Sequence, residues 1–130
     1  MSEIMPLAFS QADLFDRIEA LTDTQLDKLD FGTIGFDAET TVRRYNAFES
    51  KWAGLAPSRV LGHPLFTVVA PCMNNFLVAQ RFEDAASGAG ALDVTIDYVL
   101  TLRMRPVKVA LRLLVAPGAK FRYVLVQRSS

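Results

Sequence analysis

The last forty residues carry the clearest pattern in the chain, a regular alternation of apolar and polar positions. Apolar side chains occupy every second position from Leu92 to Leu102, with polar residues such as Asp93 and Asp97 between them. A period of two is typical of a β-strand with one buried face. The pattern returns from 107 to 113 and, after a turn at 116–119, from 121 to 127. The sequence therefore predicts three consecutive strands here.

Two further strands are predicted near the start of the chain, from Phe31 to Phe36 and from Thr41 to Tyr45. The turn-forming residues 37–40 between them favour a hairpin. Two strands, several short helices and then three strands indicate an α+β domain with a five-stranded antiparallel sheet. We expect helices on one face of this sheet, a separate N-terminal segment on the other, and a pocket between the helices and the sheet.

The N-terminal segment has helical rather than strand spacing. Leu14, Ile18 and Leu21 fall on one face of a helix predicted from Gln11 to Leu21, with Ser10 as its N-cap. A second short helix, capped by Thr22 or Asp23, should run towards residue 29. Helices this short depend on docking. We therefore divide the chain into a helical cap at 1–29, able to detach, and a core at 30–130.

The middle of the chain predicts more short helices, beginning at Asn46, at 57–61 and at 76–86. Asn46 and Glu49 have the spacing of a capping box, in which the Glu49 carboxylate would reach back to a backbone N–H.

Composition narrows the class of protein. The chain has 130 residues, is 51% hydrophobic, and balances 14 Lys and Arg against 14 Asp and Glu. This fits one domain, and the absence of a basic run argues against nucleic-acid or membrane-surface binding. A single cysteine precludes an internal disulfide, and no signal peptide or membrane-spanning run is visible. We expect a cytoplasmic protein, a monomer or a weak homodimer.

The single cysteine, Cys72, lies in the stretch from Val69 to Phe76. Pro71 fixes its own φ and biases Ala70 away from helix, so Cys72 should lie on a stiff, non-helical segment. Asn74 or Asn75 could cap the following helix, whose dipole would favour a thiolate nearby. The alternative is an inert, buried cysteine that acts as a small hydrophobe.

Several of these residues together resemble the photoactive yellow protein family. The resemblance rests on Tyr45 and Glu49 four residues apart, then Gly62 and Phe66, then Ala70-Pro71-Cys72. It extends nearly end to end, from 25–27 and 31–34 to 104–109 and 124–128. It implies a PAS-like five-stranded antiparallel sheet with flanking short helices and an N-terminal helical cap. It also implies a blue-light photoreceptor for sensory transduction, with no enzymatic activity, that carries p-coumaric acid (4-hydroxycinnamic acid) as a covalently bound chromophore.

The resemblance assigns a role to each matching residue. Cys72 would hold the chromophore as a thioester, while Tyr45 and Glu49 would hydrogen-bond its phenolate oxygen. A buried phenolate needs donors, and a protonated carboxyl group adds no second charge, so Glu49 should be protonated at neutral pH. Met104 matches a methionine close to the chromophore. The remaining pocket would be lined by Ile34, Phe66, Val69, Ala70, Pro71, Met73, Leu100 and Leu102.

Two positions depart from the family. A threonine that supports the tyrosine hydroxyl and an arginine that shields the pocket are common there, and this chain has Ala53 and Leu55 instead. We expect Tyr45 to lose a hydrogen-bond partner, and the chromophore to show a changed colour or a mixed protonation state.

The mechanism implied is electrostatic. After trans-cis photoisomerisation of the chromophore, Glu49 would give up its proton and leave a carboxylate in an apolar interior, at a cost of several kcal/mol. The least stable part of the fold, residues 1–29, would then be released as the signal to an unknown protein partner.

Other readings of the same residues remain. The strongest is a chromophore-free PAS-type interaction module in which Cys72, Tyr45 and Glu49 are structural. A cysteine hydrolase would need His63 as its base, and nothing in the sequence orients it. One cysteine and one histidine are too few for a metal site. A flavin photoreceptor of the PAS type would need a cysteine helix that this chain lacks.

Overall fold

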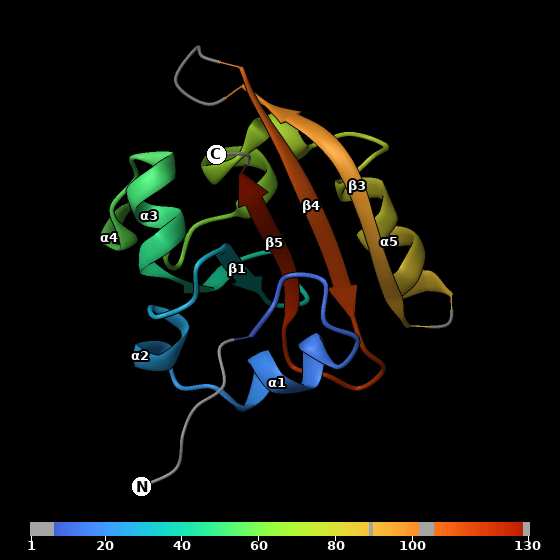
Figure 1. Ribbon diagram of the computed structural model, residues 1–130. Helices are drawn as coiled ribbons and strands as arrows, with labels where there is room; N and C mark the ends of the chain where they lie inside the picture. Colours follow the sequence, from blue (N-terminus) through green and yellow to red (C-terminus); the bar gives the residue numbers. More distant parts are fainter. Residues whose placement is uncertain (1–6, 89, 102–105, 129–130) are drawn as a thin grey trace, which may run out of the picture.

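The computed structural model describes residues 7–88, 90–101 and 106–128. These residues form a five-stranded antiparallel sheet in the order β2-β1-β5-β4-β3 (Figure 1). Its strands are β1 (Gly32–Phe36), β2 (Val42–Tyr45), β3 (Leu92–Leu100), β4 (Val107–Val115) and β5 (Arg122–Arg128). The α+β fold with this sheet is confirmed. The first and last parts of the chain meet at the centre, where β1 pairs with β5.

Short helices fill the rest of the described chain. They are α1 (Leu14–Ala20), α2 (Asp23–Leu26), α3 (Ala47–Ala53), α4 (Pro57–Val60), the π-helical turn η1 (Leu65–Val69), the 3₁₀ turn η2 (Pro71–Met73) and α5 (Ala79–Ser87). Within the parts of the chain that the structure describes, none of the helices has the length and apolar character needed to cross a bilayer.

The helix α1 is shorter than predicted. It follows Asp13 rather than Ser10, because Gln11 closes a separate turn: its backbone N–H donates to Ala8 O, and its Oε1 accepts from the Ala8 N–H at 3.0 Å. The predicted cap at Ser10 is therefore wrong. The predicted cap of α2 is confirmed, since Thr22 and Gln25 form a reciprocal capping box.

One face of the sheet packs against α3, α4, η1, η2 and α5. Alternate strand residues such as Ile34, Leu111 and Val124 point into this helix-side core. Phe36 lies at its centre, edge to face with Phe82 at 4.9 Å between ring centroids.

The opposite face is covered by residues 7–29, drawn in blue in Figure 1. Leu14, Ile18 and Leu26 are fully buried against Phe31 and Tyr123 of the core. Arg112 of β4 lies on this cap-covered face and is buried. Its guanidinium donates to the carbonyl oxygens of residues 9 and 11 at 2.9 and 2.7 Å. Residues 7–29 are thus docked on the sheet by apolar contacts and by these two hydrogen bonds.

The segment around Cys72 is the main departure from the predicted secondary structure. Cys72 lies within the 3₁₀ turn η2, so the expectation of a non-helical segment is wrong. Pro71 occupies the first position of that turn, where its fixed φ and missing N–H cost nothing. The following helix, α5, starts at Ala79 rather than at the predicted residue 76, and Phe76 is 83% exposed.

Candidate functional site

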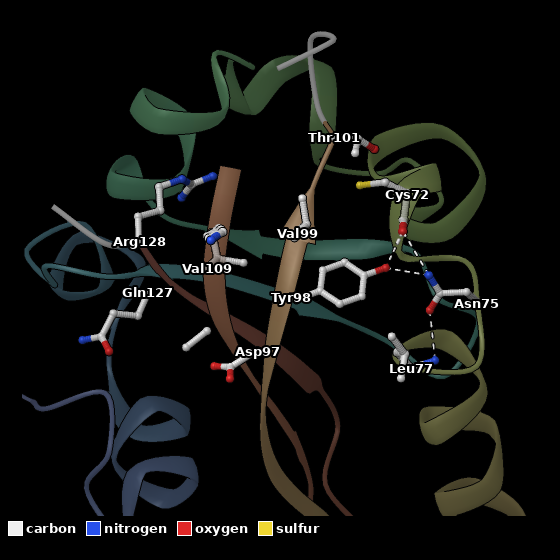
Figure 2. Close-up of a pocket in the computed structure, with 12 residues that line it drawn as sticks. Cys72, Asn75, Leu77, Asp97, Tyr98, Val99, Thr101, Val109, Gln127 and Arg128 are labelled. Carbon is white, nitrogen blue, oxygen red and sulfur yellow. Dashed lines mark hydrogen bonds between the residues drawn. The ribbon is translucent and has the colours of Figure 1, made fainter. Parts of the chain in front are cut away.

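The backbone around Cys72 is fixed by two polar side chains. Tyr98 Oη donates to the Cys72 carbonyl oxygen, and Asn75 Nδ2 donates to the same oxygen at 3.2 Å and to Tyr98 Oη at 2.6 Å. Figure 2 shows these three residues together on one side of a pocket, with the sulfur directed towards its interior. Cys72 is a free, partly buried thiol. Its position is therefore set by β3 as well as by its own turn.

Tyr98 was missed as a site residue. In the sequence it appeared only as one of the inward-facing positions of β3. The available signal was its hydroxyl, because a tyrosine among aliphatic inward positions must find a hydrogen-bond partner when it is buried.

Glu49 projects from α3 into the interior, where it is 2% exposed. Both carboxylate oxygens accept from the Arg128 guanidinium, Oε1 from Nη1 at 2.7 Å and Oε2 from Nη2 at 3.1 Å. The Arg128 side chain is only 10% exposed. This bidentate, charge-assisted pair was not predicted, and its partners are 79 residues apart.

The pair explains two further features of Glu49. Asn46 Oδ1 accepts from the Glu49 N–H at 3.1 Å, but the Glu49 carboxylate pairs with Arg128 and does not complete the predicted capping box. Burial raises the pKa of Glu49, while the hydrogen bonds and charge of Arg128 oppose that rise. The expectation of a protonated Glu49 at neutral pH stays a prediction, and Arg128 acts against it.

Gly32 of β1 makes room for this carboxylate. A Cβ placed on Gly32 would overlap Oε1 of Glu49, and it would lie 3.2 Å from the Glu49 Cβ, which the helix backbone holds in place. The absence of a side chain at residue 32 therefore allows Glu49 to lie flat against the sheet.

Tyr45 lies at the end of β2, beside Glu49. Its Oη donates to the Leu55 carbonyl oxygen at 3.1 Å, and Ser50 Oγ donates to the same oxygen at 2.8 Å. Ala53 offers Tyr45 no side-chain hydroxyl, and the backbone carbonyl of Leu55 serves as its hydrogen-bond partner instead. Burial first, and then the charge of Glu49, raise the pKa of Tyr45. The two predicted polar residues are thus close enough to interact.

The other predicted pocket residues divide into three groups. Ile34, Phe66, Val69, Ala70, Met73 and Leu100 are buried in the helix-side core, as hydrophobes would be under any function. Pro71 is exposed, so it does not line an interior pocket. Leu102 and Met104 lie outside the described residues.

A single row of residues crosses the sheet from the Cys72 side to the Glu49 side. Tyr98 of β3 pairs with Val109 of β4, and Val109 pairs with Arg128 of β5. Tyr98 contacts Cys72 at one end of the row, and Arg128 contacts Glu49 at the other. Two strand spacings, about 10 Å in all, separate the end strands of this row.

The same row lines an open pocket of about 1080 Å³, together with Cys72 and Asn75 (Figure 2). Asp97 of the edge strand β3 and Lys108 of β4 also line it, and both are exposed, so the pocket is open to solvent. Among the described residues, Tyr45 and Glu49 are not part of the lining. Arg128 therefore stands between this pocket and Glu49.

Other chemistries find little support in the geometry. His63, the base that a cysteine hydrolase would need, is exposed and is not among the described residues that line the pocket of Cys72. The described residues also contain no cluster of three or more His, Cys, Asp or Glu side chains that could hold a metal ion.

Comparison with solved structures shows the class of fold. The chain superimposes on the PAS domain of the RpfR quorum-sensing receptor from Cronobacter turicensis with a TM-score of 0.60 over 79% of this chain and 97% of the other, at 13% identity, a likeness in fold alone. It superimposes better, with a TM-score of 0.79 and 34% identity, on the photoactive yellow protein domain of the sensor histidine kinase Ppr from Rhodospirillum centenum, covering 87% of this chain and 98% of that domain. This is a PAS-type sensor fold.

Comparison of the amino-acid sequence with known proteins shows the family to which the chain belongs. The chain is 30% identical to photoactive yellow protein from Rhodothalassium salexigens over 122 residues, which are 94% of this chain and 97% of that protein. No protein-family model matches the chain. The chain belongs to the photoactive yellow protein family. Membership supports a PAS-type blue-light photoreceptor with a chromophore, a sensor rather than an enzyme.

Proposed function

We propose that this protein is a blue-light photoreceptor that carries p-coumaric acid as a thioester on Cys72 in the cytoplasm. The observation that supports this most is the row Tyr98–Val109–Arg128, because it joins the single thiol to the buried Glu49 across the floor of the helix-side core. A ring on a three-carbon acyl chain spans about two strand spacings when extended.

The residues present fit such a group. Cys72 supplies a sulfur at a pocket wall, and Tyr98 and Asn75 fix its backbone. Attachment forms a bond from sulfur to the acyl carbon and expels the leaving group of an activated acyl donor, while the thiol proton goes to solvent. The p-coumaroyl group, once bound, supplies a double bond that blue light isomerises from trans to cis.

Tyr45 and Glu49 are proposed to hold the phenol end. For this, Tyr45 turns its hydroxyl from the Leu55 carbonyl, and the Glu49 carboxyl group shares a proton with the phenol oxygen. When that end moves away, Glu49 is left as a carboxylate that is 2% exposed, and the cost of burying this charge is several kcal/mol, which the pairing with Arg128 offsets only in part. Such a cost is comparable with the whole stability of a small domain, so a conformational change that reaches a protein partner follows.

The test is reconstitution of the purified chain with an activated p-coumaric acid. We expect one acyl group per chain by mass spectrometry and a coloured adduct that bleaches in blue light. Cys72→Ala removes the chain's only thiol and should remove the adduct while leaving the fold intact. A chain that stays unmodified and colourless would instead be the chromophore-free PAS module. An adduct that persists in Cys72→Ala would also contradict the proposal.

A further inference from the structure

The Leu55 carbonyl oxygen accepts two side-chain hydrogen bonds beside the proposed phenol site. Tyr45 Oη donates to it at 3.1 Å and Ser50 Oγ donates to it at 2.8 Å. A carbonyl oxygen has two lone pairs, so it can accept both bonds at once. Tyr45 is buried, and Ser50 and Leu55 are partly buried. Loss of one donor therefore leaves the oxygen satisfied, whereas loss of both would leave a shielded acceptor without a protein partner.

The end of α3 brings this carbonyl group within reach of Tyr45. Gly54 caps the helix in the left-handed conformation, with a φ of 72°, and its N–H donates to the Ser50 carbonyl oxygen at 3.0 Å. A left-handed residue at this position turns the chain back over the last helical turn. Leu55, the next residue, therefore lies beside the Ser50 side chain. The local sequence thus supplies a backbone acceptor and a hydroxyl donor where Ala53 supplies neither group from its side chain.

We propose that Ser50 is a positioning residue for Tyr45, because it keeps the Leu55 carbonyl satisfied when the Tyr45 hydroxyl turns to the phenol end of the chromophore. This inference deepens the proposed function and rests on it. Tyr45 has one hydroxyl proton, so it cannot donate to the Leu55 carbonyl and to a phenol oxygen at the same time. The Ser50 bond remains at the carbonyl after Tyr45 leaves, which lowers the free-energy cost of the exchange.

The consequence concerns the charge on the chromophore oxygen. A hydrogen bond donated by Tyr45 favours the phenolate over the phenol, because it stabilises the charged form. Without Ser50, the Leu55 carbonyl would depend on Tyr45 alone and would compete more strongly for its hydroxyl proton. The phenolate would then lose part of its stabilisation. Ser50 should therefore lower the pKa of the bound phenol, and it should do so only through Tyr45.

The first experiment needs no chromophore. Ser50→Ala and Tyr45→Phe each leave the Leu55 carbonyl one donor, and the double variant leaves it none. We expect the unfolding equilibrium constant of the double variant to exceed the product of the two single effects by about threefold or more, as for residues that share a partner. Urea unfolding of the whole chain measures this coupling, in which the higher helix propensity of alanine cancels. Independent effects of the two substitutions would overturn the proposal.

Ser87→Ala is the matched control. Ser87 also donates its hydroxyl to a backbone carbonyl near a helix end, that of Glu83 in α5, at 2.9 Å. This carbonyl is not an acceptor of Tyr45, whose hydroxyl donates to Leu55. Combined with Tyr45→Phe, Ser87→Ala should therefore show no coupling. A coupling as large as that of Ser50→Ala would overturn a specific role for Ser50.

The second experiment uses the protein reconstituted with p-coumaric acid. A phenolate absorbs at longer wavelength than the phenol, so an absorption titration gives the pH at which the two forms are equal. In Ser50→Ala we expect this midpoint to rise by about half a pH unit or more, a roughly threefold change in the ratio of the two forms. Ser50→Thr, which keeps the hydroxyl, should restore the midpoint. In a Tyr45→Phe background, Ser50→Ala should leave it unchanged.

The outcomes separate this inference from the proposed function. A coloured adduct whose midpoint is the same in Ser50→Ala, or moves equally in the Tyr45→Phe background, would overturn the role of Ser50 and leave attachment to Cys72 intact. If no form of the chain takes up p-coumaric acid, the proposed function fails and the role of Ser50 towards the chromophore fails with it. The urea experiment would then still decide whether Ser50 and Tyr45 share the Leu55 carbonyl.

Discussion

Gly32 is the residue whose size decides where Glu49 can lie. Its hydrogen atoms face the carboxylate, and a Cβ there would overlap Oε1. Because Arg128 and the α3 backbone hold Glu49 from two sides, the carboxylate cannot simply swing away. The glycine is thus needed for the space it leaves rather than for an unusual backbone angle.

We predict that Gly32→Ala lowers the free energy of unfolding by about 1–3 kcal/mol, as overpacking of a close-packed site does. In a Glu49→Ala background the same substitution should cost clearly less, since the obstructing carboxylate is gone. Urea unfolding of the two single variants and the double variant measures this coupling. Strictly additive effects would show that Gly32 does not act through Glu49.

At the scale of elements, β2 connects the two layers on either side of the sheet. Alternation along the strand points Tyr45 to the helix side and its neighbour Arg44 to the cap side. Arg44 Nη1 donates to Ile18 O at 3.1 Å and to Tyr123 Oη at 2.9 Å, and Nη2 donates to Leu21 O. One buried side chain therefore satisfies two carbonyl groups of the cap.

We predict that Arg44→Gln loosens residues 7–29, with a loss of about 2–3 kcal/mol for the buried charge-assisted bonds. Hydrogen exchange by mass spectrometry should rise in these residues more than in β4 and β5. Arg43→Gln is the control, because Arg43 lies on the same strand but is 52% exposed in a surface pair with Asp37. A surface pair contributes little. Equal exchange in the two variants would contradict the role given to Arg44.

For the molecule as a whole, one sheet separates a polar site from a docked cap. The helix side holds the buried Glu49 and the partly buried Arg128, while the cap side is held by apolar contacts and by Arg44 and Arg112. The cap also ends in short helices with little stability of their own. The free-energy cost of a new buried charge on the helix side would therefore be reduced most easily by local unfolding of residues 7–29.

We predict that illumination of the reconstituted protein increases hydrogen exchange in residues 7–29 relative to the dark. Cys72→Ala treated with the same acyl donor provides the control, since light should then change nothing. Equal protection of the cap in light and dark would contradict release of the cap, although the proposed attachment of the chromophore to Cys72 would be unaffected.

Much of the fold could be predicted from the sequence. The alternation in 92–100, 107–113 and 121–127 determined the strands, and the turn at 37–40 determined the first hairpin, because side-chain periodicity is a local property of the backbone. The family motif also pointed to Cys72, Tyr45 and Glu49. Local spacing gave a wrong prediction for the Glu49 carboxylate, for which a backbone N–H and Arg128 were alternative partners. The carboxylate forms an ion pair with Arg128 instead of the predicted capping box.

Only the tertiary structure decided which partners the buried polar side chains bind. The register of β5 against β1 and β4 brings Arg128 to Glu49, and the docking of the cap gives Arg112 its backbone acceptors more than 100 residues away. The turn after α3 brings the Leu55 carbonyl to Tyr45. Neither hydrophobic period nor composition encodes these pairs, because a buried charge takes whichever opposite group the packed chain brings within reach.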